Sequence, residues 1–247
     1  MQRISTYKYK TISKLGDGGF GYVEKIQLFN SSETHSDFYA RKVLAPKVDL
    51  KMYKERFQRE VISQDKCQHG NVVRIYLCDL FCENPFFIME LAECDLQSLI
   101  NNNTLSEKEK IDVIMMVCAG LSHIHKLGFL HRDIKPFNIL RFSNGIYKVS
   151  DFGLVRKTIQ QEQSNILTSL NMRLGTDDYF APELLYKGND YSEKSDIFAM
   201  GRVFEQLQLE NDDINILISK CTSLDPRHRY SSIQEFLDEL KATMEVS

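Results

Sequence analysis

The sequence contains no tryptophan, only five prolines, and no apolar run long enough to cross a membrane. A membrane-spanning helix needs about 20 apolar residues, whereas the longest apolar stretch here, residues 111–121, is interrupted by Asp112. No proline-rich or glycine/serine-rich linker divides the chain, and no solenoid-length repeat is present. These absences exclude membrane-spanning, collagen-like, coiled-coil and repeat architectures.

A strong charge imbalance is also missing. The 31 basic and 34 acidic side chains give a net charge of −3. Nucleic-acid-binding domains usually carry a basic excess, and anionic membranes attract polybasic segments. We therefore expect neither a nucleic-acid nor a membrane partner. The 247 residues, of which 43% are hydrophobic, suffice for one or two domains with a buried core.

The cysteines do not form a disulfide framework. The six are scattered without C-x-x-C spacing, and the N-terminal residues lack the apolar stretch of a signal peptide. We expect reduced thiols and a cytoplasmic location, or a host-cell cytosol if the protein is a secreted effector. A zinc site at Cys78, Cys82 and Cys94 is the alternative, but no histidine pair lies nearby.

Hydrophobic periodicity divides the chain into two parts. The first part predicts strands at residues 9–15, 22–29, 38–44, 72–82 and 86–91, a polar hairpin loop at 30–37 and a charged helix at 51–67. The second part predicts helices at residues 111–126, 195–207, 213–221 and 232–244, the first preceded by a capping box of Ser106 and Glu109. Strands followed by helices indicate an α+β fold.

A glycine-rich segment provides the first functional signal. Gly16, Gly18 and Gly21 have the spacing G-x-G-x-x-G, which lets backbone amides approach phosphate oxygens. Dinucleotide-binding folds share this spacing but open a helix there, whereas a strand is predicted here. Lys42, on a later strand, is either a surface residue or a buried cation paired with Glu60.

The second signal is a cluster of catalytic residue types. Asp133, Lys135 and Asn138 lie within six residues, and Asp151 follows the predicted strand at 147–150. A carboxylate can accept a proton from a hydroxyl, and a lysine can neutralise a transferred phosphoryl group. The amide oxygen of Asn138 and the carboxylate of Asp151 are hard ligands suited to Mg²⁺.

Together these motifs resemble the eukaryotic-type protein kinase family over residues 9–240. The resemblance implies one kinase domain over residues 1–247, with a bilobal fold divided into an N-lobe (1–91) and a C-lobe (92–247). It implies ATP and Mg²⁺ as cofactors and a protein substrate. The scaffold alternative, a kinase-like module controlled by a partner, is less favoured because Lys42, Asp133 and Asp151 are all retained.

The resemblance also implies residue roles. Asp133 would be the base, Lys135 would steady the γ-phosphoryl group, and Lys42 would bind the α- and β-phosphates and pair with Glu60. Asn138 and Asp151 would bind Mg²⁺. The nucleotide-binding residues would be Gly16, Gly18, Gly21, Val23, Ala40, Lys42, Met89, Glu90, Leu91 and Ala92, with Met89 at the back of the adenine pocket and residues 90–92 as the hinge.

Further positions resemble the serine/threonine branch. Lys135 and the pair Gly175-Thr176 are typical of it. Thr168 or Ser169 would accept a regulatory phosphate bound by Arg132. Structural positions are Glu183, which would form an ion pair with Arg229, and Asp196, which would support the catalytic loop. The regulatory set is thus Thr168, Ser169, Thr176 and Arg132.

Three departures from the family pattern have consequences. Only 23 residues separate Gly201 from Asp225, so we expect the docking helix of the C-lobe to be missing or reduced, which suggests an activating or stabilising protein partner. Gln64 stands where the family has an apolar residue, so it needs a polar partner if buried. Phe137 stands where kinases of basic substrates often carry an acid, so we predict no basic preference. In its shortness the chain resembles minimal bacterial and effector kinases.

Overall fold

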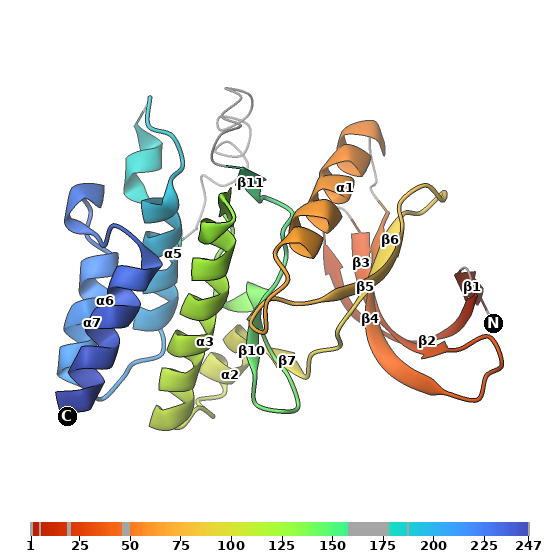
Figure 1. The fold of residues 1–247 in the computed structure, drawn as a ribbon, viewed down its shortest axis with the longest axis horizontal. Coiled ribbons are helices and arrows are strands. Elements are labelled where there is room, and N and C mark those ends of the chain that lie inside the picture. The colour runs from red at the N-terminus through yellow and green to blue at the C-terminus, as the bar shows by residue number, and fades with distance from the viewer. Residues whose placement is uncertain are drawn as a thin grey trace. The chain divides into compact units, whose positions relative to one another are not determined.

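The computed structural model describes residues 2–4, 6–18, 21–45, 50–157, 178–186 and 188–246. Contacts within the chain divide it into two compact units, Met1–Glu93 and Cys94–Ser247. The first unit is built mainly of strands and the second mainly of helices (Figure 1), which confirms the predicted α+β class.

The first unit contains an antiparallel sheet with the strand order β1-β2-β3-β4-β6-β5 (Figure 1). Its strands are β1 (Gln2–Ile4), β2 (Tyr7–Gly18), β3 (Gly21–Phe29), β4 (Ser36–Leu44), β5 (Ile75–Asp79) and β6 (Phe86–Met89). Alternate residues of β3, namely Glu24, Ile26 and Leu28, are buried on one face, as the two-residue period of a strand requires. The predicted hairpin loop connects β3 to β4.

One face of the sheet packs against helix α1 (Leu50–Lys66). Phe57 and Val61 of α1 form a buried cluster with Leu44 of β4 and Phe87 of β6. The rings of Phe57 and Phe87 lie with their centroids 5.3 Å apart. These contacts hold the helix against β6 and against β4, the strand that carries Ala40 and Lys42.

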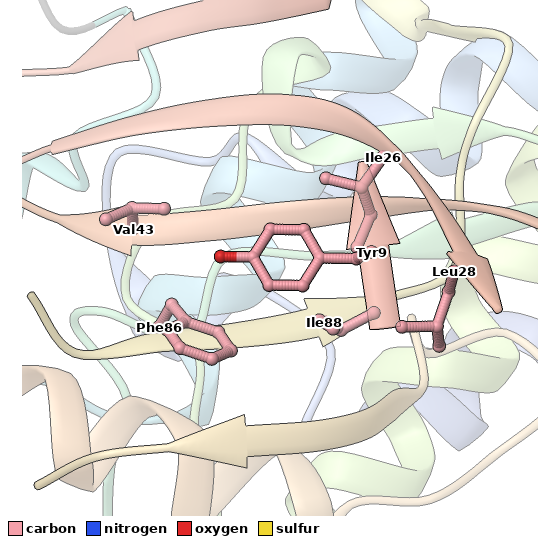
Figure 2. Packing of buried hydrophobic residues seen from close by; sticks show 6 residues of the cluster. All are labelled: Tyr9, Ile26, Leu28, Val43, Phe86 and Ile88. Carbon is pink, nitrogen blue, oxygen red and sulfur yellow. The ribbon is translucent and has the colours of Figure 1, made fainter. Parts of the chain in front are cut away.

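The other face of the sheet has its own apolar cluster. Figure 2 shows Tyr9 in the middle of these side chains, which are Tyr9, Ile26, Leu28, Val43, Phe86 and Ile88. A charged pair is buried beside them. The guanidinium of Arg41 lies 4.7 Å above the Tyr9 ring and 4.4 Å above the Phe86 ring, and its Nη1 is 2.7 Å from Oε1 of Glu24.

Two predicted strands are longer in the sequence analysis than in the structure. Residues 72–82 were predicted as one strand, but β5 covers only Ile75–Asp79. The backbone leaves the sheet at Asp79 because the Oδ1 of Asp79 accepts the N–H groups of Phe81 and Cys82 and closes a turn. Strand β6 ends at Met89, two residues before the predicted end.

The second unit consists of helices with short strand pairs. The helices are α2 (Leu96–Asn101), α3 (Glu107–Lys126), α5 (Glu193–Glu205), α6 (Asp212–Cys221) and α7 (Ile233–Val246). The strands are β7 (Cys94–Asp95), β8 (Phe129–Leu130), β9 (Ile139–Arg141), β10 (Tyr147–Val149) and β11 (Arg156–Lys157). Single 3-10 turns occur at η1 (Pro136–Asn138), η2 (Pro182–Leu185) and η3 (Pro226–His228). Helix α3 contacts α7, and α6 contacts both α5 and α7 (Figure 1).

The predicted capping box begins α3. The N–H of Glu109 donates to Oγ of Ser106 at 3.3 Å, and the N–H of Ser106 donates to Oε2 of Glu109 at 3.0 Å. These bonds satisfy donors that a helix N-terminus otherwise leaves unpaired. The buried residues of α3 follow the predicted helical spacing, and they include Val117, Cys118 and Leu121.

Helix α5 is followed directly by α6. Residues 206–211, all of which are described, connect them without another helix, which confirms the expected shortening of this region. The two helices approach closely at Gly201, where a Cβ would lie 2.6 Å from Cβ of Cys221. Within the described part of the chain, no helix is both long and apolar enough to cross a membrane.

Candidate active site

In the first unit, the predicted contact between Lys42 and Glu60 is present. Nζ of Lys42 on β4 lies 2.6 Å from Oε1 of Glu60 on α1. Glu60 is buried and Lys42 is half-buried. A buried charge is costly unless it is paired, so each side chain stabilises the ionised form of the other. The Lys42 side chain stays 25% exposed in this pair, whereas that of Glu60 is 5% exposed.

The glycine-rich segment spans the end of β2 and the start of β3. Gly16 pairs with Val23 and Gly18 with Gly21, while residues 19 and 20 lie outside the described residues. A Cβ on Gly21 would lie 2.0 Å from the carbonyl oxygen of Val43, so the fold requires glycine there. A Cβ on Gly16 would meet nothing within 4 Å. Glycine at position 16 therefore leaves backbone open, which suits the close approach of a phosphate.

The residues predicted to surround adenine lie on adjacent strands. Val23 of β3 pairs with Lys42 of β4, and Ala40 of β4 pairs with Met89 of β6. Ala40 is buried, and Met89 packs partly against the Phe57–Phe87 cluster. The strand register thus brings three of the predicted apolar contacts together at one end of the sheet.

Residues 90–92 follow β6 outside regular structure. The N–H of Glu90 donates to the carbonyl of Arg74 at 3.1 Å, and Oε2 of Glu90 accepts the Arg74 N–H at 2.9 Å. Among the described residues, neither Leu91 nor Ala92 exchanges a backbone hydrogen bond with another residue. Their backbone groups are available to a ligand, which is the property that the hinge prediction requires.

Gln64 is buried in α1 and has found one polar partner. Its Nε2 donates to the carbonyl of Val73 at 2.8 Å. Its Oε1 is buried and accepts no hydrogen bond from any residue that the structure describes. An unpaired buried acceptor costs roughly 1–3 kcal/mol. The predicted need of Gln64 for a partner is therefore met on one side only.

In the second unit, two neighbouring side chains bind the carboxylate of Asp133, the predicted base. Nζ of Lys135 is 3.2 Å and 3.1 Å from its two carboxylate oxygens, and Nδ2 of Asn138 donates to its Oδ2 at 3.0 Å. Nδ2 of Asn138 also donates to the Asp133 carbonyl at 2.7 Å. These bonds fix the carboxylate in one orientation, as a general base requires.

The predicted magnesium ligands lie at the same end of the β9–β10 hairpin. Asn138 precedes β9, and the N–H of Ser150, just after β10, donates to the Asn138 carbonyl at 2.8 Å. Asp151 is the next residue. Because Nδ2 of Asn138 is used by Asp133, its amide oxygen, which accepts no hydrogen bond among the described residues, is left for a hard cation.

This donor set suits Mg²⁺ bound together with phosphates. Magnesium in such sites is typically held by one or two carboxylates and by the phosphate oxygens. Among the described residues, no group of three His, Cys, Asp or Glu side chains converges as a metal cage. Asp151 has a left-handed backbone conformation with φ of 62°, which is uncommon for residues other than glycine.

Asp196, at the start of α5, binds the backbone of the loop that precedes Asp133. Its Oδ2 accepts the N–H of His131 at 2.8 Å, and its Oδ1 accepts the N–H of Arg132 at 2.9 Å. The sequence analysis missed two further donors, Nε2 of His125 at 2.8 Å and the hydroxyl of Tyr191 at 3.0 Å. Burial tends to raise the pKa of Asp196, but the hydrogen bond and charge of His125 outweigh it and lower the pKa.

His131 is fully buried and neutral. Burial lowers its pKa, and the nearby carboxylates offset only part of this effect. Its Nε2 lies 3.1 Å from the carbonyl of Ser150, and its Nδ1 accepts the N–H of Asp133 at 3.4 Å. Both contacts fit one tautomer, with the proton on Nε2. His131 thereby links the loop of Asp133 to the segment of Asp151.

The predicted ion pair between Glu183 and Arg229 is present. Arg229 binds Glu183 with two hydrogen bonds, Nη1 to Oε1 at 2.9 Å and Nη2 to Oε2 at 2.8 Å. Ser195 donates a third bond to Oε1. Burial tends to raise the pKa of Glu183, but the bonds from Arg229 outweigh it, so the pKa is lowered. The pair ties the turn η2 to the segment before α7.

Most of the predicted regulatory residues cannot be placed. Thr168, Ser169 and Thr176 lie outside the described residues. Arg132 is described, and its guanidinium lies 5.2 Å above the ring of Tyr191. Arg132 also has a left-handed backbone, with φ of 70°.

Comparison with known proteins agrees with the resemblance to protein kinases that the sequence motifs indicated. The profile of the protein kinase domain family matches residues 9–212. The chain is 26% identical to the probable serine/threonine-protein kinase PknB of Lactococcus lactis, over 96% of this chain and 42% of that protein. It is 33% identical to the serine/threonine-protein kinase ICK of Mus musculus, over 81% of this chain and 30% of that protein. It is also 33% identical to mitogen-activated protein kinase 6 of Arabidopsis thaliana, over 82% of this chain and 50% of that protein. The chain thus spans half or less of the length of these relatives.

Proposed function

Because the chain belongs to the protein kinase family, we propose that it transfers the γ-phosphoryl group of ATP to serine and threonine hydroxyls of protein substrates. Residues 1–247 act as one catalytic domain in this proposal. The relatives are named as kinases, so the comparisons give no support to the scaffold alternative. Lys135, typical of the serine/threonine branch, supports the choice of acceptor.

The observation that carries the proposal is the oriented carboxylate of Asp133, held by Lys135 and Asn138. Asp133 orients the substrate hydroxyl and accepts its proton as the hydroxyl oxygen bonds to the γ-phosphorus. The bond from that phosphorus to its bridging oxygen breaks, and ADP leaves. Lys135 neutralises charge on the transferred group. Positioning and charge stabilisation supply most of the rate in such a reaction.

The other predicted residues would bind ATP or its magnesium ion. Lys42, supported by Glu60, binds the α- and β-phosphates, and the backbone at Gly16, Gly18 and Gly21 covers the phosphates. Val23, Ala40 and Met89 contact adenine, with residues 90–92 providing backbone hydrogen bonds. Asn138 and Asp151 would hold Mg²⁺, which neutralises phosphate charge when bound.

A transfer assay tests the proposal. The purified chain is incubated with γ-labelled ATP, Mg²⁺ and a generic protein substrate, beside the Asp133→Ala variant. We expect label on serine and threonine of the substrate with the wild type only, as read by phospho-amino-acid analysis. ATP binding without transfer, under conditions in which another protein kinase works, would support the scaffold alternative.

The proposal also includes regulation by phosphorylation and by a partner. A phosphate on Thr168 or Ser169 would bind Arg132 and order the segment that contains them, with Thr176 contacting the catalytic loop. The double variant Thr168→Ala/Ser169→Ala would then lose activity. The short connection from α5 to α6 suggests an activating or stabilising protein partner. The six free cysteines support a reducing, cytoplasmic location.

A further inference from the structure

Arg41 and Lys42 are neighbouring cations whose side chains lie on opposite faces of β4. Nζ of Lys42 is 2.6 Å from Oε1 of Glu60 on α1. The guanidinium of Arg41 lies over the rings of Tyr9 and Phe86, which Figure 2 shows in the apolar cluster of the other face. Because the two cations share one peptide bond, a contact that fixes the backbone at Arg41 also fixes the point from which the Lys42 side chain extends.

Apolar packing alone specifies the position of this strand only weakly. Val43 is buried in the apolar cluster on one face of the sheet, and Leu44 is buried against α1 on the other face. Strand register is strongly specified where only one face is buried, because a shift would then expose apolar side chains. Both faces of β4 are covered at this end, so a contact with a defined direction adds information that burial does not supply.

The buried ion pair of Arg41 with Glu24 is such a directional contact. The two residues are direct partners across β4 and β3, beside the partners Lys42 and Val23. Nη1 of Arg41 lies 2.7 Å from Oε1 of Glu24, and each side chain is only 10% exposed. The hydroxyl of Thr11 donates to the same oxygen at 3.2 Å. A shift of β4 along β3 would break the pair and leave two buried charges without their partners, which is costly.

The pair also connects the four strands that carry the nucleotide-binding residues predicted in the sheet, namely β2, β3, β4 and β6. Tyr9 and Thr11 of β2 contact it from one side, and Phe86 of β6 contacts it from the other. Glu24 and Arg41 themselves belong to β3 and β4. One buried ion pair thus touches every strand of the sheet on which a proposed ATP contact lies.

We infer that Arg41 and Glu24 are positioning residues for ATP binding: the direction of their bond fixes β4 against β3 and so places Lys42 at the nucleotide phosphates. The inference rests on the proposed kinase activity and extends it to residues on the opposite face of the sheet. A buried ion pair adds little net stability over apolar residues of similar volume, whereas apolar cores lose a unique arrangement before they lose stability. Replacing the pair by apolar residues should therefore separate ATP affinity from stability.

Variants of Glu24 separate the direction of the bond from its charge. The Kd for ATP is measured by calorimetry and the free energy of unfolding by denaturant titration. Glu24→Gln loses the charge but keeps an oxygen that accepts the Arg41 bond, so the protein should be less stable while the Kd changes less than about twofold. Glu24→Leu removes the acceptor and should raise the Kd about fivefold, well below the roughly 100-fold cost of misplacing reacting groups by about 1 Å.

The double variant Arg41→Met/Glu24→Leu should regain most of the stability and yet keep the raised Kd for ATP. Lys8→Met, which removes a partly exposed ion pair with Glu33 elsewhere in the sheet, is the control and should leave the Kd unchanged. A purely structural ion pair predicts a different pattern, in which the Kd follows the stability from variant to variant.

The outcomes separate this inference from the proposed function. A wild type that neither binds ATP nor transfers phosphate shows that the kinase proposal itself is wrong. If Glu24→Gln and Glu24→Leu bind ATP equally, or if the double variant binds it as the wild type does, the inference is wrong and the kinase proposal stands. The comparison of Glu24→Gln with Glu24→Leu decides the matter even if the double variant does not fold.

Discussion

Oδ1 of Asp196 accepts the backbone N–H of Arg132, a residue 64 positions earlier in the chain, at 2.9 Å. Arg132 needs such support because its backbone is left-handed, with φ of 70°. A non-glycine residue in this region stores strain that its surroundings must offset. Asp196 therefore sets the backbone from which Asp133 extends, because it binds the N–H groups of the two residues before Asp133.

Replacing this carboxylate should damage both folding and catalysis. In Asp196→Asn, the amide nitrogen would face two donors, either His125 and His131 or Arg132 and Tyr191. Losing two bonds to a charged acceptor should lower the free energy of unfolding by about 3 kcal/mol. Misplacement of the loop should lower kcat roughly 100-fold. Chemical denaturation and steady-state kinetics measure the two effects. Asp190→Asn, an exposed site, is the control, and equal losses in both variants would contradict the role given to Asp196.

The buried pair Arg41–Glu24 offers a test by double-mutant cycle. Arg41→Met or Glu24→Leu alone should destabilise the protein by about 3–5 kcal/mol, because each leaves one charge unpaired beside Tyr9 and Phe86. The double variant Arg41→Met/Glu24→Leu should recover most of that loss, since well-packed apolar residues often replace a buried ion pair without net cost. Denaturant titration gives the values. Additive losses in the double variant would show that the two side chains do not stabilise one another.

Two glycines of the glycine-rich segment should respond differently to substitution by alanine. Gly21→Ala places a Cβ 2.0 Å from the Val43 carbonyl oxygen and should lower the melting temperature by several degrees. Gly16→Ala meets no atom within 4 Å and should leave the melting temperature unchanged. If the backbone at Gly16 contacts phosphate, Gly16→Ala should nevertheless raise KM for ATP several-fold. Equal KM values for Gly16→Ala and the wild type would remove Gly16 from the nucleotide site.

The buried imidazole of His131 predicts a pH dependence of stability. Burial lowers its pKa in the folded state below the ordinary value of 6.5. Between that lowered pKa and 6.5 the unfolded chain therefore binds more protons, and stability falls as the pH falls. Above pH 6.5 both states are neutral and this contribution is constant. One proton corresponds to about 1.4 kcal/mol per pH unit.

Unfolding curves at several pH values between 7.5 and 5 measure this slope. His131→Gln should reduce the slope by up to one proton, whereas His35→Gln, at an exposed site, should not. In an NMR titration of the imidazole nitrogens, the folded protein should keep His131 in its neutral form, with its single proton on Nε2, at pH values somewhat below 6.5. A pKa of 6.5 or above for His131 in the folded wild type would contradict the argument from burial.

The sequence predicted two kinds of contact correctly: those between residues close together in the chain, and those between residues of recognised motifs. Helix α3 and its capping box follow from Ser106, Glu109 and the apolar spacing after them. The contacts Lys42–Glu60 and Glu183–Arg229 were expected from residues 18 and 46 positions apart. The need of a buried charge for a partner pointed to Glu60 for Lys42, whereas the pair Glu183–Arg229 was expected from the resemblance to the kinase family.

Other features depend on how strands and helices pack, which residue types do not reveal. Nothing in the sequence distinguishes Arg41, which is buried against Tyr9 and Phe86, from an ordinary charge on a strand. The early end of β5 results from the turn at Asp79, whose side chain competes with the sheet for backbone donors. The contact of His125 with Asp196 joins helices that only the folded chain brings together.

The central claim is that Asp133 is the base of a phosphoryl transfer. The most direct measurement compares Asp133→Asn with the wild type in kcat for phosphate transfer and in Kd for ATP. We predict that kcat falls at least about 100-fold, in the range that a general base contributes. The Kd for ATP should change less than about threefold, because the proposal assigns phosphate binding to Lys42 and the glycine-rich segment and not to Asp133. A variant that retains the wild-type kcat would contradict the account.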